Sequence, residues 1–122
     1  MRVLVVDHSE MYRETIRNLL TELGIEKIDE SETGMGAINK IKRLPKGTKY
    51  DIVTIDIAMP RKEGLHVLKD MTILSPESKI IVCSSKNDIS TVKIVIGFGV
   101  YGYIVKPFTK EKFLETFLKL YT

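Results

Sequence analysis

The chain is poor in cysteine and has no long apolar run. Its single cysteine, Cys83, cannot form an internal disulfide, and its place in the apolar segment 80–83 favours a small core residue. Such cysteine usage is typical of a reducing compartment, and we expect a cytoplasmic protein. No segment approaches the roughly 20 apolar residues of a membrane span, and the apolar part of the N-terminus is too short for a secretory signal. We therefore expect no membrane insertion.

Neither sign of charge is in large excess. The sequence has 19 Lys and Arg residues against 16 Asp and Glu, a net charge of +3. We interpret the basic residues as scattered rather than gathered in one arm, so charge alone indicates no nucleic-acid binding by this domain. A length of 122 residues suits one domain with one core, and we predict a single domain over residues 1–122.

Short apolar runs alternate with longer amphipathic runs along the chain. We predict strands at residues 2–6, 27–31, 51–55, 79–83 and 101–105, the second of them polar and therefore at a sheet edge. Helices are predicted at residues 10–23 and 88–98, and three more carry the apolar sets Ala37, Ile38, Ile41 and Leu44; Val67, Leu68, Met71 and Leu74; and Phe113, Phe117 and Leu118. The alternation predicts an α/β fold, a doubly wound parallel sheet with helices on both faces.

Polar side chains follow four of the predicted strands. Asp7 and His8 follow the first, Asp56 the third, Ser84 the fourth and Lys106 the fifth. The carboxyl ends of parallel strands meet at one edge of a sheet, where ligands bind in this kind of fold. We therefore expect these side chains to share one site.

The chemistry of this set suits phosphoryl transfer. Carboxylates bind a hard cation such as Mg²⁺, an ammonium group neutralises phosphoryl oxygens, and an aspartate such as Asp56 can act as the nucleophile. The sequence has no Gly-x-x-x-x-Gly-Lys-Ser/Thr loop, and no Gly-x-Gly-x-x-Gly follows the first strand. This argues against ATP as the direct phosphoryl donor.

Essentially the whole chain resembles the receiver domains of two-component response regulators, most closely the CheY-like single-domain members. Four motifs carry the resemblance, in this order: Val5-Val6-Asp7 followed by Ser9 and Arg13; Asp56-x-x-Met59-Pro60 with Gly64; the hydroxyl residue Ser84; and Tyr103-x-x-Lys106-Pro107-Phe108. The resemblance implies a flavodoxin-like, CheY-like sheet of five parallel strands in the order 2-1-3-4-5.

The resemblance also implies a role for each residue of the predicted site. Asp56 would be the phosphoacceptor, Lys106 its charge partner, Ser84 the hydroxyl that senses the phosphoryl group, and Tyr103 the switch aromatic. The domain would then accept a phosphoryl group from a sensor histidine kinase. We expect no enzyme activity beyond self-catalysed phosphorylation and dephosphorylation.

Mg²⁺ is the cofactor that the resemblance implies. Its ligands would be Asp7, Asp56 and the backbone carbonyl of Ala58. Receivers usually have a second acid where this chain has His8, so the carboxylates and Lys106 sum to one negative charge instead of two. Imidazole is also a poorer ligand for a hard cation, and we expect weakened Mg²⁺ binding with His8 as an uncertain ligand.

The predicted fourth helix, fifth strand and last helix are the expected partner surface. The fourth helix has more apolar residues than one core-facing stripe can hold, namely Ile89, Val92, Ile94, Val95, Ile96 and Phe98. Some of them must lie at the surface, beside an aromatic and basic set made of Tyr101, Tyr103, Lys93, Lys110 and Lys119. We expect a downstream protein target to bind there.

Two other functions fit parts of the sequence. A degenerate receiver would bind partners without being phosphorylated, which the departure at His8 favours. A phosphatase of the haloacid dehalogenase type also ends a strand on a catalytic aspartate, but it needs a second aspartate where this chain has Ala58. In the simplest interpretation, Asp7 and Asp56 would be strand-end turn residues or helix N-caps.

Overall fold

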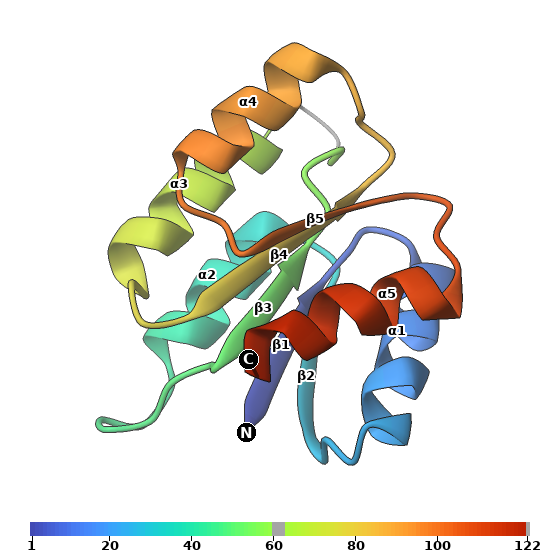
Figure 1. Ribbon diagram of the computed structural model, residues 1–122. Helices are drawn as coiled ribbons and strands as arrows, with labels where there is room; N and C mark the ends of the chain where they lie inside the picture. Colours follow the sequence, from blue (N-terminus) through green and yellow to red (C-terminus); the bar gives the residue numbers. More distant parts are fainter. Residues whose placement is uncertain (60–62, 122) are drawn as a thin grey trace.

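The computed structural model describes residues 1–59 and 63–121, and Figure 1 shows its fold. Five parallel strands form one sheet in the order β2-β1-β3-β4-β5, which confirms the predicted α/β fold and strand order. The strands are β1 (Arg2–Val6), β2 (Lys27–Ser31), β3 (Ile52–Ile55), β4 (Lys79–Ser84) and β5 (Gly102–Val105). Pro60, part of the Asp56-x-x-Met59-Pro60 motif, lies outside the described residues.

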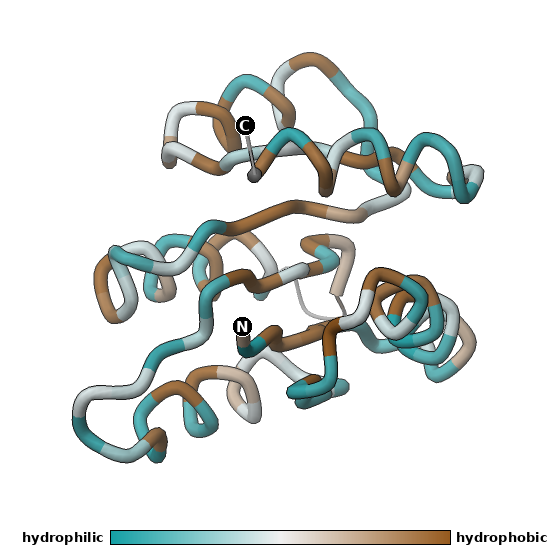
Figure 2. The backbone as a smooth tube through the Cα atoms, turned by 60° about the horizontal axis from the view of Figure 1, so that its bottom comes forward, coloured by the Kyte–Doolittle hydropathy of each residue, from teal (hydrophilic) through white to brown (hydrophobic). Residues whose placement is uncertain are grey.

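The central strands are apolar because helices cover both of their faces. All four residues of β3 are buried, as are four of the five in β1. The second strand is polar and lies at the edge of the sheet, as predicted. In Figure 2 the strands in the middle of the molecule are hydrophobic over much of their length, whereas the helices around them alternate between hydrophobic and hydrophilic residues.

Helices α1 (Glu10–Glu22) and α5 (Lys110–Leu118) cover one face of the sheet. Helices α2 (Gly34–Lys42), α3 (Gly64–Leu74) and α4 (Ile89–Gly97) cover the other face (Figure 1). A short 3-10 helix, Lys119–Tyr121, follows α5. Each layer buries its own hydrophobic cluster against the sheet. Among the described residues, no helix is both long and apolar enough to cross a membrane.

Side-chain caps fix where most of the helices begin. The side chains of Ser9, Thr33, Asp88 and Thr109 each accept a hydrogen bond from a backbone N–H in the first turn of the helix that follows. The predicted helix and strand ends differ from the observed ones by one or two residues at several positions. For example, the apolar pattern extends to Leu44, but α2 ends at Lys42 and Leu44 packs against the core from the loop.

Gly64 is the first residue of α3, and its hydrogen side chain allows the helix to approach the strand that it follows. A Cβ atom at this position would lie 2.0 Å from the backbone carbonyl oxygen of Ile57. A clash with a backbone atom cannot be relieved by a change of rotamer, as a clash with a flexible side chain can. Gly64 therefore sets how closely α3 packs behind the loop that carries Asp56.

We predict that Gly64→Ala lowers the free energy of unfolding by about 1–3 kcal/mol, because the added methyl group overpacks a backbone contact. Gly97 in α4 is the matched control, since a Cβ atom there meets nothing within 4 Å. Gly97→Ala should raise the free energy of unfolding by up to about 1 kcal/mol through helix propensity. Urea unfolding of both variants measures the difference. Equal effects of the two substitutions would contradict this account of Gly64.

Candidate functional site

Two buried carboxylates and one ammonium group meet at the carboxyl ends of the strands. The Lys106 Nζ lies 2.6 Å from Asp7 Oδ2 and 2.9 Å from Asp56 Oδ2. The second oxygen of each carboxylate accepts a backbone N–H, from Ser9 at 2.9 Å and from Ala58 at 2.8 Å. The structure therefore brings together three of the residues that the sequence predicts for the site, each with hydrogen-bonding partners.

Strand register places these groups side by side. Val6 pairs with Ile55, so the residues that follow them, Asp7 and Asp56, leave the sheet as neighbours. The Asp56 N–H also donates to the Val6 carbonyl at 3.0 Å. On the other side, the Lys106 N–H donates to the Ser84 carbonyl at 2.9 Å, one residue beyond the end of β5. The Lys106-Pro107 peptide bond is cis.

Burial makes the charges of this cluster depend on one another. The side chains of Asp7 and Lys106 are 1% and 7% exposed. Burial alone would lower the pKa of Lys106, but hydrogen bonds and charge attraction from both carboxylates hold that pKa above its ordinary value. The stabilisation that this shift gives is complete at neutral pH and is lost only as the pH rises through the raised pKa. At neutral pH the Lys106 side chain therefore keeps its positive charge.

Tyr12, which is not among the site residues predicted from the sequence, completes the surroundings of the ammonium group. The Lys106 Nζ lies 3.9 Å from the centroid of the Tyr12 ring, a cation–π contact. Tyr12 in turn contacts Phe108, whose ring centroid is 5.9 Å away. An aromatic three residues after the N-cap Ser9 was the available signal, but helical periodicity alone does not show which strand end it faces.

Ser84 and Tyr103 are linked through the backbone of one residue between β4 and α4. The Lys86 N–H donates to Ser84 Oγ at 3.2 Å, and the Tyr103 hydroxyl donates to the Lys86 carbonyl. Ser84 is fully buried at the end of β4, and the Tyr103 ring packs against the core layer that contains α4. The two residues that the resemblance names as the switch are thus coupled by hydrogen bonds.

The oxygen ligands at this site suit Mg²⁺, although there is one carboxylate fewer than receiver domains usually have. Asp7 and Asp56 supply two, the backbone carbonyl of Ala58 is a candidate third oxygen, and Mg²⁺ commonly keeps several waters. His8 is exposed, and among the described residues no group of three His, Cys, Asp or Glu side chains is arranged to hold a metal ion. In this structure the His8 side chain is therefore not grouped with the two carboxylates.

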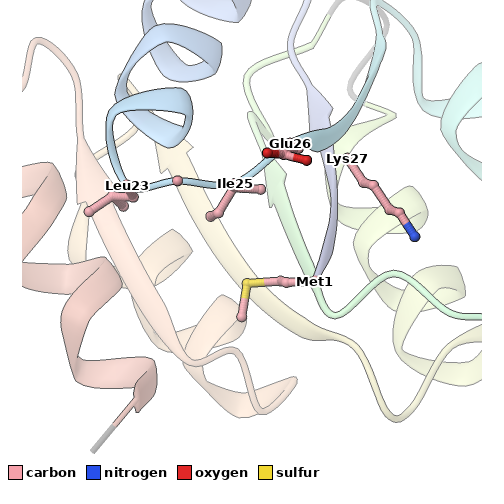
Figure 3. A pocket seen from close by; sticks show the side chains of 6 residues that line it. Met1, Leu23, Ile25, Glu26 and Lys27 are labelled. Atoms are coloured by element: carbon pink, nitrogen blue, oxygen red, sulfur yellow. The ribbon is translucent and has the colours of Figure 1, made fainter.

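Two other features lie outside this site. A hollow of about 330 Å³ lies at the opposite end of the sheet, and Figure 3 shows the residues that line it: Met1, Leu23, Gly24, Ile25, Glu26 and Lys27. Its charged lining residues Glu26 and Lys27 are exposed, whereas Asp7 and Asp56 at the other end of the sheet are buried. Cys83 is a buried core residue, as predicted, and burial raises the pKa of its thiol to about 12, which disfavours the nucleophilic thiolate.

Comparisons with known proteins agree with this geometry. The family model described as "Response regulator receiver domain" matches residues 3–118. The chemotaxis protein CheY of Thermotoga maritima is 36% identical over 119 residues, 98% of this chain and 96% of that protein. The CheY of Bacillus subtilis is 35% identical over 97% of this chain and 95% of that protein. A signal receiver domain from Clostridium thermocellum has a TM-score of 0.86 at 23% identity over 98% of this chain and 95% of that one, which shows the likeness of fold.

We predict that Tyr12→Leu lowers the free energy of unfolding by about 1 kcal/mol more than Tyr12→Phe, because only leucine removes the ring from the desolvated ammonium. The pKa of Lys106 should fall in the leucine variant and stay unchanged in the phenylalanine variant. Urea unfolding and NMR titration of the lysine side chain measure the two effects. A Lys106 pKa that is the same in both variants would show that the ring merely packs against the site.

Proposed function

We propose that this chain, which belongs to the family of response regulator receiver domains, accepts a phosphoryl group on Asp56 from a sensor histidine kinase. The observation that carries the proposal is the position of the Lys106 ammonium, in contact with both Asp7 and Asp56 at the carboxyl ends of the strands. An ammonium group at that position can neutralise the negative charge that a phosphoryl group brings to Asp56. A pair of ordinary turn residues would need no such partner.

The proposed reaction needs little beyond placement and charge. A carboxylate oxygen of Asp56 forms a bond to phosphorus while the bond from phosphorus to the donor imidazole nitrogen breaks, and that nitrogen keeps the electron pair. Lys106 stabilises the phosphoryl oxygens, and Asp7 holds Lys106 in place. Mg²⁺, held by Asp7, Asp56 and the Ala58 carbonyl, would add further neutralisation. We propose no enzyme activity beyond self-catalysed gain and loss of the phosphoryl group.

The link from Ser84 through Lys86 to Tyr103 supports a switch that leads from the phosphorylated site to α4. A phosphoryl group on Asp56 would attract the Ser84 hydroxyl, which accepts the Lys86 N–H. The same peptide segment accepts the Tyr103 hydroxyl through the Lys86 carbonyl. A movement of Ser84 would therefore change the packing of Tyr103 against α4.

The proposed partner surface is formed by α4, β5 and α5, and its ligand is a downstream protein. Helix α4 buries only Val95, and it leaves Ile89 73% and Ile96 60% exposed. Tyr101 is also exposed, beside β5. Several large, exposed apolar side chains on one surface are typical of a site that binds another protein. We place the protein in the cytoplasm, with neither nucleic-acid binding by this domain nor membrane insertion.

We predict that acetyl phosphate adds one phosphoryl group to the wild-type protein and none to Asp56→Asn, because the amide is not a nucleophile of this kind. Asp70→Asn is the control, since Asp70 is exposed on α3. Intact-mass spectrometry measures the adduct. Loss of the adduct in the Asp70 variant, or its survival in the Asp56 variant, would contradict the assignment. A wild-type protein that stays unmodified would favour the degenerate receiver.

We predict that His8→Asp binds Mg²⁺ at least about tenfold more tightly than the wild type, because a third carboxylate restores a hard ligand and a second net negative charge. Calorimetric titration with Mg²⁺ measures both affinities. His8→Asn serves as the control, since it removes the imidazole without adding charge. Equal affinities for the wild type and His8→Asp would show that residue 8 does not reach the metal.

A further inference from the structure

The segment that joins α2 to β3 carries an excess of positive charge. Five exposed basic residues lie within residues 40–49: Lys40, Lys42, Arg43, Lys46 and Lys49. No Asp or Glu occurs between residues 33 and 50. The whole chain has a net charge of only +3, so its remaining residues sum to −2, which is 3 minus 5. The interpretation of the basic residues as scattered rather than gathered in one arm therefore does not hold for this segment.

Ion pairs within the described chain do not neutralise this segment. Elsewhere, some exposed cations have an acidic partner, as Lys110 has Glu22 at 2.7 Å and Arg17 has Glu30 at 2.7 Å, whereas Lys69 and Lys112 form no ion pair with a described residue. None of the five basic residues in segment 40–49 forms an ion pair with a described residue. The C-terminal dipole of α2 accounts for Lys40 and Lys42 in its last turn. It does not account for Lys46 and Lys49, which lie beyond the helix.

Hydrogen bonds order the loop that carries these charges. The Thr48 N–H donates to the Pro45 carbonyl at 3.0 Å, and the Thr48 hydroxyl donates to the same oxygen at 2.6 Å. Gly47 has a φ of 87°, which is the backbone that a type II turn needs at its third position. The turn fixes Lys46 at its second position. Figure 1 shows this connection extending away from the sheet, on the side of α2 and α3.

A hollow of about 320 Å³ lies between this loop and the end of α3. Its lining combines apolar and cationic residues, including Ile41, Leu44, Leu74, Lys42, Lys46 and Lys49. Leu74 is 38% exposed at this rim, and Ile73 beside it is 71% exposed. Glu77 is the one acidic residue among the described lining residues. Three cations and an apolar floor therefore face one concave surface.

We infer that this hollow binds an acidic, amphipathic segment of another protein, whose carboxylates contact Lys42, Lys46 and Lys49 and whose apolar side chains enter between Leu44 and Leu74. Charge complementarity selects the acidic partner, and the apolar lining selects one with hydrophobic side chains. A nucleic acid would use aromatic stacking or a dense row of phosphate contacts, and none of the described residues that line the hollow is aromatic. A flat anionic membrane would not enter a concave site that includes Glu77.

The proposed surface is separate from the phosphoacceptor site and from the partner surface of α4, β5 and α5. It lies at the amino end of β3, whereas Asp56 lies at the carboxyl end of the same strand. The inference therefore does not rest on phosphorylation, and Asp56→Asn should bind the same segment with unchanged affinity.

The test uses a fluorescein-labelled amphipathic helical peptide with leucines at i, i+3, i+4 and i+7 and glutamates at its other positions. Fluorescence anisotropy should show saturable binding to the full chain. The triple variant Lys42→Glu, Lys46→Glu and Lys49→Glu should lose at least about tenfold in affinity. The control is a second triple variant with the same net charge as the first, made at other exposed positions: Lys27→Glu, Lys69→Glu and Lys112→Glu. Its affinity for the peptide should fall by less than about threefold. Leu74→Ser should also weaken binding.

Several outcomes would overturn the inference. These are equal losses in the two triple variants, an unchanged affinity in Leu74→Ser, or NMR shift changes that gather on α4 instead of residues 41–49 and 74–77. Binding of phosphatidylserine vesicles or duplex DNA through the same three lysines, with no binding of the acidic peptide, would also overturn it. Retained phosphorylation by acetyl phosphate shows that the triple variants are folded.

Discussion

The ammonium of Lys106 lies between two carboxylates that are almost fully buried, and much of the molecule serves to keep it there. A buried carboxylate without a partner is costly, so Asp7 and Asp56 can share one edge of the sheet only if a cation lies within hydrogen-bonding distance of both. The register of β1 against β3 and the position of β5 in the sheet meet that requirement, because they place the three groups at one edge. It also explains why a strand as apolar as β3 is followed directly by an aspartate. The rigid, buried strand holds the carboxylate in place without competing for its hydrogen bonds.

The parts of this arrangement that depend on chain order could be predicted from the sequence. Parallel strands place their carboxyl ends at one edge, so Asp7, Asp56 and Lys106 could be brought together before their distances were known. The parts that depend on side-chain direction could not be predicted. The stripe of α1 that faces the core does not reveal that Tyr12 stacks on Lys106, and a serine after a strand does not reveal that its hydroxyl reaches Tyr103 through the Lys86 backbone.

Which charged residues lack an ion-pair partner could not be predicted from the sequence, for a related reason. A count of charges along the chain treats Lys46 and Lys110 alike, yet Lys110 has Glu22 as a partner and Lys46 has no described partner. Ion pairs form between residues that are distant in sequence, so only the fold shows which charges remain uncompensated. The same holds at the acidic end, where His8 follows Asp7 in sequence but stays exposed while its neighbour is buried. Adjacency in the motif therefore does not make His8 part of the charge cluster.

The two ends of β3 carry opposite kinds of surface, and the strand that joins them is short and rigid. Four residues of parallel strand span roughly 13 Å, and all four are buried between the two helical layers. The basic segment enters the strand at its amino end and Asp56 leaves it at the carboxyl end, so neither surface can move toward the other without breaking the core. A protein segment held in the hollow between α2 and α3 would thus leave the Asp56 edge open to a phosphoryl donor. The exposed residues of α4, such as Ile89 and Ile96, do not line this hollow, so a target on the proposed α4 surface and a segment in the hollow would contact different residues.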